Sequence, residues 1–147
     1  MVDEYLKAVG LRPGYAWCQA FVYWCYNTAA KRSGVSNPMV KTAGVYDCWN
    51  RTGSHQQKTA VRITKETLLK EQMPILPGDQ FVLLLGMGAG HTGIVEKVVW
   101  TGMPDNPVLL HTIEGNSNAA GSREGYAVVR RTRSLNEAAL KGIIRYL

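Results

Sequence analysis

The sequence of 147 residues has no long apolar run and no internal repeat. No apolar stretch reaches the ~20 residues that span a bilayer, which excludes a helical membrane protein. Residues 1–5 show no basic segment followed by an apolar core, so no signal peptide is expected. We therefore expect action in the cytoplasm, export by another route, or a chain excised from a longer protein.

Cysteine is scarce, with only Cys18, Cys25 and Cys48 in the chain. Three cysteines cannot all pair with one another, so at least one thiol is free unless it pairs outside the chain. The absence of a Cys-x-x-Cys pair and of closely spaced cysteines and histidines argues against structural zinc. A disulfide scaffold is also disfavoured, because a chain of this length with 46% hydrophobic residues can bury a sizeable core.

Acidic residues are the minority among the charged ones, and the formal net charge is +6. This balance suits an acidic partner such as nucleic acid, an anionic cell-wall polymer or a membrane surface. The basic residues are scattered except for Arg130, Arg131 and Arg133, which are most simply interpreted as a solvated basic face. Since no helix rich in Lys and Arg is visible, we expect no nucleic-acid binding. Without an apolar run of bilayer length, we also expect no membrane insertion.

Helical spacing dominates the first half of the chain, and short strand patterns dominate the second. We expect helices over residues 3–10, 16–31 and 42–51, with the second ending near Gly34. Residues 52–72 are expected to form a loop followed by a short strand or helix. Strands are expected over residues 80–85, 91–100, 108–114, 126–132 and 142–146. This order predicts one α+β domain over residues 1–147, with N-terminal helices packed on an antiparallel sheet.

Cys18 follows a turn at residues 12–15 and begins an apolar run with helical spacing. A thiol at a helix N-terminus faces the positive end of the helix dipole and unpaired backbone N–H groups. Both favour the reactive thiolate, and the same N–H groups can stabilise an oxyanion. The alternative is that Cys18 is a small buried residue, as most free cysteines are.

A nucleophilic cysteine needs a nearby base and usually a group that orients the base. His91 is the first residue of an expected strand, and Gly90 and Gly93 leave room for a substrate beside it. Glu114 and Asn116 are two residues apart at the end of the next strand, so they share a face if the strand continues. Either can accept a hydrogen bond from His91 Nδ1–H and leave Nε2 facing the sulfur. Alternatively, Glu-Gly-Asn forms a turn.

Four motifs occur in a characteristic order: Trp-Cys-x-Ala-Phe-Val at residues 17–22, Pro-Gly-Asp at 77–79, Gly-His-Thr-Gly-Ile-Val-Glu at 90–96 and Glu-Gly-Asn at 114–116. Together they resemble the CHAP family of cysteine amidohydrolases and peptidases, relatives of the NlpC/P60 enzymes. The resemblance covers nearly the whole chain. It implies a papain-like α+β fold that cleaves peptidoglycan, either at the amide between N-acetylmuramic acid and L-alanine or at a peptide bond of the stem or cross-bridge.

The same resemblance implies roles for individual residues. Cys18 matches the nucleophile, His91 the general base and acid, Glu114 the acidic third member and Asn116 the amide that often accompanies it. It also implies peptidoglycan as the partner and no cofactor.

The chain departs from the family pattern beside the nucleophile. Many relatives have glutamine just before the cysteine, whereas here Trp17 precedes it and Gln19 follows it. We therefore expect the backbone N–H of Cys18 to stabilise the oxyanion, and Trp17 and Gln19 are candidate substrate contacts.

Some phage relatives carry an Asp-rich calcium loop upstream of the cysteine, and its absence here predicts no metal. Family domains often begin with an additional helix before the segment equivalent to Tyr5, so a truncated domain or a natural short form is expected.

Several biological roles share this chemistry. The candidates are a housekeeping wall-remodelling enzyme, a phage lysin and an antibacterial effector, each acting at the bacterial cell wall in the periplasm or outside the cell. Without a signal peptide, delivery would need a holin or a secretion system, with an immunity or delivery protein as a candidate partner. A non-catalytic wall-binding module on the same fold is the alternative. Chemically competent residues at all four catalytic positions argue against that module.

Overall fold

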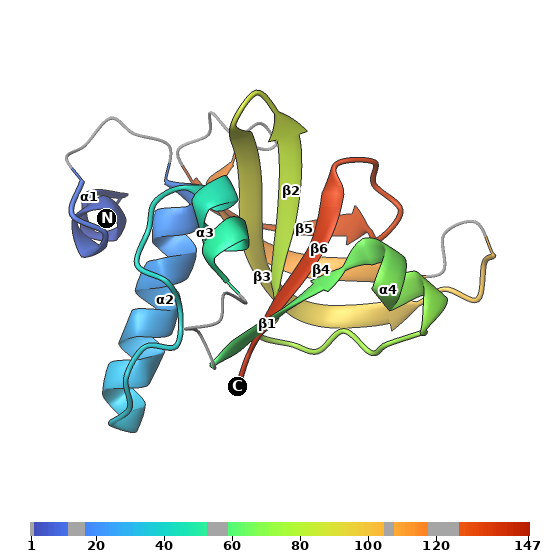
Figure 1. Cartoon of the computed structure of the whole chain (residues 1–147), viewed down its shortest axis with the longest axis horizontal. Coiled ribbons are helices and arrows are strands. Elements are labelled where there is room, and N and C mark those ends of the chain that lie inside the picture. Colours follow the sequence, from blue (N-terminus) through green and yellow to red (C-terminus); the bar gives the residue numbers. More distant parts are fainter. Residues whose placement is uncertain (1, 12–16, 53–58, 105–107, 118–126) are drawn as a thin grey trace.

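The computed structural model describes residues 2–11, 17–52, 59–104, 108–117 and 127–147. Helices precede most of the strands along the chain (Figure 1). The helices are α1 (Val2–Ala8), α2 (Cys18–Ser33), α3 (Val45–Arg51) and α4 (Lys65–Lys70). The strands are β1 (Ala60–Thr64), β2 (Gln80–Gly86), β3 (Ala89–Trp100), β4 (Val108–Ser117), β5 (Ala127–Ser134) and β6 (Leu140–Tyr146).

All six strands form one antiparallel sheet with the order β1-β6-β2-β3-β4-β5. Helix α2 packs against β3 and β4, α3 packs against β2 and β3, and α1 lies on α2 away from the sheet (Figure 1). Helices packed on an antiparallel sheet confirm the predicted α+β class. The last strand, β6, is inserted between β1 and β2 rather than added at an edge.

The ends of the elements differ from the sequence expectations in ways that have local causes. Helix α2 ends as expected, because Gly34 adopts a left-handed conformation (φ 70°) and its N–H caps carbonyls of the last turn. Residues 52–72 contain both a strand and a helix, since the Thr64 side chain accepts a hydrogen bond from Thr67 N–H and caps α4. Strand β4 continues to Ser117, so Glu-Gly-Asn lies in a strand and the turn interpretation is wrong.

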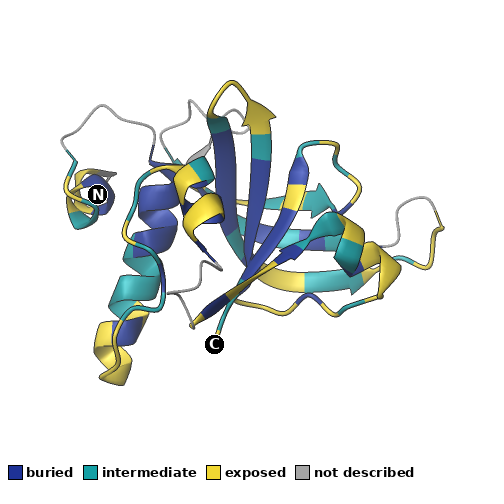
Figure 2. Ribbon diagram, in the orientation of Figure 1, coloured by how far each residue is buried: buried dark blue, intermediate teal, exposed yellow. Residues whose placement is uncertain are grey.

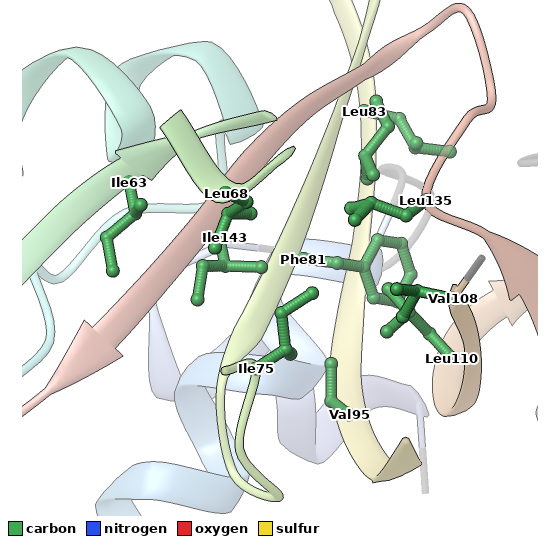
Figure 3. Packing of buried hydrophobic residues seen from close by; sticks show 11 residues of the cluster. Ile63, Leu68, Ile75, Phe81, Leu83, Val95, Val108, Leu110, Leu135 and Ile143 are labelled. Atoms are coloured by element: carbon green, nitrogen blue, oxygen red, sulfur yellow. The ribbon is translucent and has the colours of Figure 1, made fainter. Parts of the chain in front are cut away.

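Apolar side chains pack against the sheet both beside α4 and beside α2 and α3. The first cluster lies between the sheet and α4 and includes Phe81, Leu83, Leu110 and Ile143 (Figure 3). On the helix side, α2 is buried over its N-terminal half and exposed at its C-terminal end (Figure 2). Burial of the first turn of α2 places Cys18 inside the protein rather than on its surface. Among the described helices, none is long and apolar enough to cross a membrane.

Candidate active site

Cys18 is the first residue of α2 and is only 2% exposed. The first intrahelical hydrogen bond runs from Phe21 N–H to Trp17 O (2.8 Å), so the N–H groups of residues 18–20 have no acceptor within the helix. Trp17 supplies no side-chain cap bond to them. The thiol therefore lies among backbone donors at the positive end of the helix dipole.

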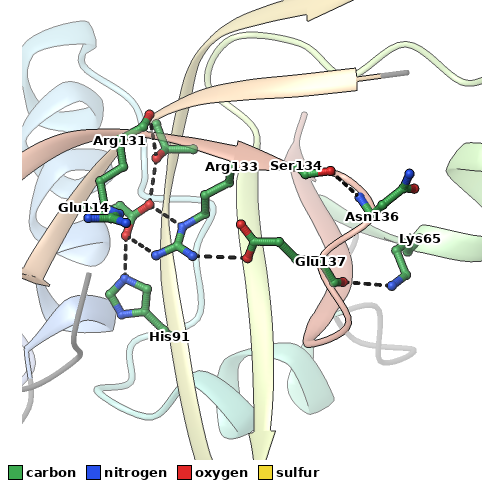
Figure 4. A network of polar contacts seen from close by, with 9 residues as sticks. Lys65, His91, Glu114, Arg131, Arg133, Ser134, Asn136 and Glu137 are labelled. Carbon is green, nitrogen blue, oxygen red and sulfur yellow. Dashed lines mark hydrogen bonds and ion pairs between the residues drawn. The ribbon is translucent and has the colours of Figure 1, made fainter. Parts of the chain in front are cut away.

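His91 and Glu114 form a buried pair on neighbouring strands (Figure 4). His91 Nε2 lies 2.7 Å from Glu114 Oε1, and the two side chains are 3% and 0% exposed. The sequence analysis expected Nδ1 to contact this carboxylate and Nε2 to face the sulfur. The structure has the opposite arrangement, because the ring approaches β4 with its Nε2 edge.

The other ring nitrogen, Nδ1, is the one left for Cys18. Nδ1 is buried and has no hydrogen-bond partner of ordinary geometry among the residues that the structure describes, while the Cys18 thiol lies close enough to His91 to raise its pKa. A buried ring nitrogen without a partner is costly, and a neighbouring sulfur can satisfy it. The arrangement therefore places Cys18 where His91 can take its proton.

The protonation of His91 gives a direct test of this arrangement. Burial lowers the pKa of His91, but hydrogen bonds with Cys18 and Glu114, and their negative charges, outweigh burial and raise it from 6.5 to about 9. We expect the imidazolium to persist as the pH rises and to lose its proton near pH 9. Titration of the imidazole nitrogens by NMR measures this, and a midpoint near 6.5 would contradict the pairing.

Glu114 is held by more than the histidine. Arg133 Nε lies 2.5 Å from Oε2 and its Nη2 lies 2.7 Å from Oε1, while Thr112 Oγ1 donates to Oε2 at 2.7 Å (Figure 4). Burial raises the pKa of Glu114, but the hydrogen bonds from Arg133 and His91 outweigh it and lower the pKa from 4.5 to about 2. Glu114 is therefore a fixed carboxylate with both oxygens occupied.

The glycines that flank the histidine do not leave open space. A Cβ atom at Gly90 would lie 2.8 Å from Val45 Cβ, and one at Gly93 would lie 2.6 Å from Phe81 Cε1 and 2.8 Å from Glu114 Cγ. The expectation that these glycines make room for a substrate is corrected. They instead allow α3 and the Glu114 side chain to approach the backbone of β3.

The two candidate substrate contacts beside the nucleophile are both interior. Gln19 is fully buried, and its Oε1 accepts a hydrogen bond from Gln80 Nε2 at 2.8 Å. Trp17 is 4% exposed and stacks on Tyr5, with ring centroids 5.5 Å apart. These positions assign both side chains to interior packing rather than to substrate contact.

Asn116 lies within β4, two residues after Glu114 on the same strand, but its side chain is outside the described part of the structure. Its role as a supporting amide stays a prediction. In the described ranges no group of three or more His, Cys, Asp or Glu side chains is arranged to hold a metal ion.

Sequence reasoning missed Thr112 and Arg133. Arg133 was grouped with a solvated basic face, but its side chain is only 11% exposed. The signal that could have found it is the alternation of β5, in which Arg130 is exposed and Arg131 and Arg133 are partly buried. Arg133 is opposite Leu110 of β4, so the two side chains lie on the same face of the sheet. Glu114 is four residues after Leu110 on that strand and therefore lies on this face too.

Comparison with known proteins agrees with the motifs. The family model of the CHAP domain matches residues 10–116, well over half of the chain. No curated protein and no solved structure matches the chain. CHAP domains are typically hydrolases that act on peptidoglycan, with amidase or peptidase activity at the cell wall. The matched segment spans Cys18, His91 and Glu114, and the chain therefore belongs to the CHAP domain family.

Proposed function

We propose that this chain is a single catalytic domain that hydrolyses an amide bond of peptidoglycan by a Cys-His-Glu mechanism. The observation that carries the proposal is a continuous buried relay from a thiol at a helix N-terminus to His91 and on to Glu114. In this relay Cys18 is the nucleophile, His91 the base and acid, and Glu114 the group that orients the imidazole. Asn116 is the proposed supporting amide.

The proposed reaction proceeds through a thioester. His91 Nδ1 takes the thiol proton, and the Cys18 sulfur attacks the carbonyl carbon of the scissile amide. The backbone N–H of Cys18, at the N-terminus of α2, stabilises the oxyanion. His91 then protonates the departing amine, and a water molecule deprotonated by His91 hydrolyses the thioester and restores the thiol.

A basic groove supports peptidoglycan as the partner. A cavity of about 560 Å³ between α1 and α2 is lined by Lys7, Lys31 and Lys41, and Glu4 is the single acidic side chain among the described residues that line it. The rings of Tyr23 and Trp24 also line it. Cationic side chains beside aromatic surface suit a polymer of sugars and carboxylates.

Reversing charge in this groove should weaken wall binding. For Lys7→Glu/Lys31→Glu we expect several-fold less protein to sediment with insoluble peptidoglycan at low salt, with the difference shrinking as salt screens the charges. The matched control is Lys70→Glu/Lys141→Glu, which changes the net charge equally at exposed lysines that are not among those lining the groove. Equal losses in the two double variants would contradict a role for the groove.

Digestion of purified peptidoglycan, followed by mass spectrometry of the released fragments, tests the proposed function. Free stem peptides that begin with the L-alanine amine establish an amidase, and cut stems or cross-bridges establish an endopeptidase. Failure to release any fragment from walls of several stem and cross-bridge types would contradict the proposal and favour the wall-binding module.

The biological setting we propose is lysis or remodelling of the cell wall, as a phage lysin, an antibacterial effector or a housekeeping enzyme. Delivery by a holin or a secretion system brings the protein to the wall from the periplasm or from outside the cell. A neighbouring holin gene supports the lysin, and a neighbouring immunity gene supports the effector.

A further inference from the structure

Arg133 contacts the same carboxylate, Glu114, that His91 contacts. Its guanidinium binds both carboxylate oxygens, through Nε to Oε2 (2.5 Å) and Nη2 to Oε1 (2.7 Å), so that Oε1 is shared with His91 Nε2 (Figure 4). The remaining Nη1 donates to Glu137 Oε2 at 3.2 Å. A planar fork that meets a carboxylate at two points fixes its orientation, which a lysine cannot do.

Packing holds this fork in place. The Arg133 guanidinium lies over the Phe81 ring, 5.4 Å from its centroid, and the same ring lies 6.3 Å from the His91 ring. Phe81 is fully buried, so it separates both groups from water. Thr112 completes the set by donating to Oε2, and the Arg131 carbonyl accepts from the same hydroxyl at 3.3 Å.

Four ionisable groups of the described residues surround His91 in this network, and Arg133 is the one cation among them. The charged groups linked to it in this network are Cys18 from α2, Glu114 from β4, Arg133 from β5 and Glu137 from the turn after β5. Glu137 is at the rim, with its side chain 32% exposed, whereas Glu114 is fully buried. Arg133 therefore offsets part of the buried Glu114 charge, which still raises the pKa of His91.

We propose that Arg133 is a positioning residue that clamps Glu114 against His91 and offsets part of its charge, so that the Glu114–Arg133 pair presents His91 with a fixed hydrogen-bond acceptor of reduced charge. This inference rests on the proposed function for the role of Cys18, but its residues and contacts stand independently of the substrate. Cys18 and Glu114 then both favour the protonated form of His91, and Glu114 also fixes the orientation of the ring.

Removing the Glu114 charge alone and removing it together with the Arg133 charge should affect His91 differently. Glu114→Gln keeps an acceptor for His91 but leaves the buried Arg133 cation without its carboxylate next to the imidazolium. Glu114→Gln/Arg133→Met removes both charges and leaves a neutral acceptor. We expect the single variant to lower the pKa of His91 by one unit or more, a change of at least about tenfold in its protonation equilibrium. We expect the double variant to recover most of that loss.

The His91 pKa is measured by NMR of the imidazole nitrogens, and the fraction of Cys18 thiolate is followed by its ultraviolet absorbance. Neither readout needs peptidoglycan, so a failed wall digestion with intact titrations would reject the proposed function alone. Arg130→Met is the matched control, because Arg130 lies on the same strand but pairs with Glu96 at the surface. It should leave both titrations unchanged.

Arg133→Met by itself separates charge from packing. Without the cation, Glu114 acts on His91 as a full negative charge, so the His91 pKa should rise while peptidoglycan turnover falls because the carboxylate is no longer held. If Arg133→Met does not fold, the double variant still provides the test, since it leaves no buried charge unpaired. A double variant as impaired as Glu114→Gln, or a His91 pKa unmoved by both single variants, would overturn the proposal.

Discussion

Peptidoglycan hydrolysis should be lost when Cys18 is replaced by alanine, with a fall in rate on the order of 10⁴-fold or more. Every proposed covalent step forms or breaks a bond to the Cys18 sulfur, so no other side chain can substitute for it. The fold should survive, because alanine removes only one sulfur atom from a cluster that also contains Val45, Cys48 and Trp49. Fragment release measured by mass spectrometry and unfolding measured by circular dichroism report the two effects separately.

Cys48→Ala is the matched control for this prediction. Cys48 is a free thiol in the same cluster and is fully buried, but it lies in α3 and has no place in the relay. Its replacement should cost about 1 kcal/mol or more of stability and leave hydrolysis near that of the unmodified protein. Retained hydrolysis in Cys18→Ala, or equal losses in the two variants, would remove Cys18 from the role of nucleophile.

The largest effect on stability is expected at Gly142. This residue lies in β6, opposite Thr64 of β1 and Val82 of β2, so its backbone has a hydrogen-bonded strand on each side. A Cβ atom there would lie 2.1 Å from the carbonyl oxygen of Ile63 and 2.9 Å from the Thr64 Cα. Both atoms belong to backbone, which cannot rotate away, so Gly142→Ala should separate β1 from β6. We expect a loss of about 3 kcal/mol or more in the free energy of unfolding, measured by urea denaturation.

Gly44→Ala serves as the comparison for that variant. Gly44 precedes α3, has an extended backbone, and its nearest neighbour to an added Cβ is Asp47 Cβ at 3.4 Å, an ordinary contact. Its replacement should change stability by less than about 1 kcal/mol. A Gly142→Ala protein that unfolds at the same urea concentration as Gly44→Ala would contradict the predicted clash between the added Cβ and the backbone of β1.

Local patterns were enough to predict the fold class and the order of the elements. The spacing of apolar residues after Cys18 predicted a helix, and the structure contains it from Cys18 to Ser33. Glycine-rich punctuation after residue 73 predicted a set of strands, which form one antiparallel sheet. These predictions succeed because helical and strand periodicity are properties of neighbours along the chain.

The same local reasoning was misleading for residues whose surroundings come from distant segments. Arg133 belongs to a basic cluster in sequence, yet it binds Glu114, 19 positions earlier. Gln19 follows the nucleophile, yet its partner is Gln80, 61 positions later. A polar side chain gives no sign in the sequence of whether its partner is water or another buried group.

The sequence by itself determined which chemistry the chain can carry: a thiol at a helix start, a histidine on a strand, and an acid on the next strand, in the order of the CHAP motifs. Tertiary structure alone decided that His91 meets Glu114 through Nε2 and leaves Nδ1 for Cys18. It also decided that Arg133 pairs with the carboxylate and that β6 enters the sheet between β1 and β2. The physical reason is that residue type and spacing define local conformation and available groups, whereas ring orientation, charge balance and strand order depend on contacts between segments far apart in the chain.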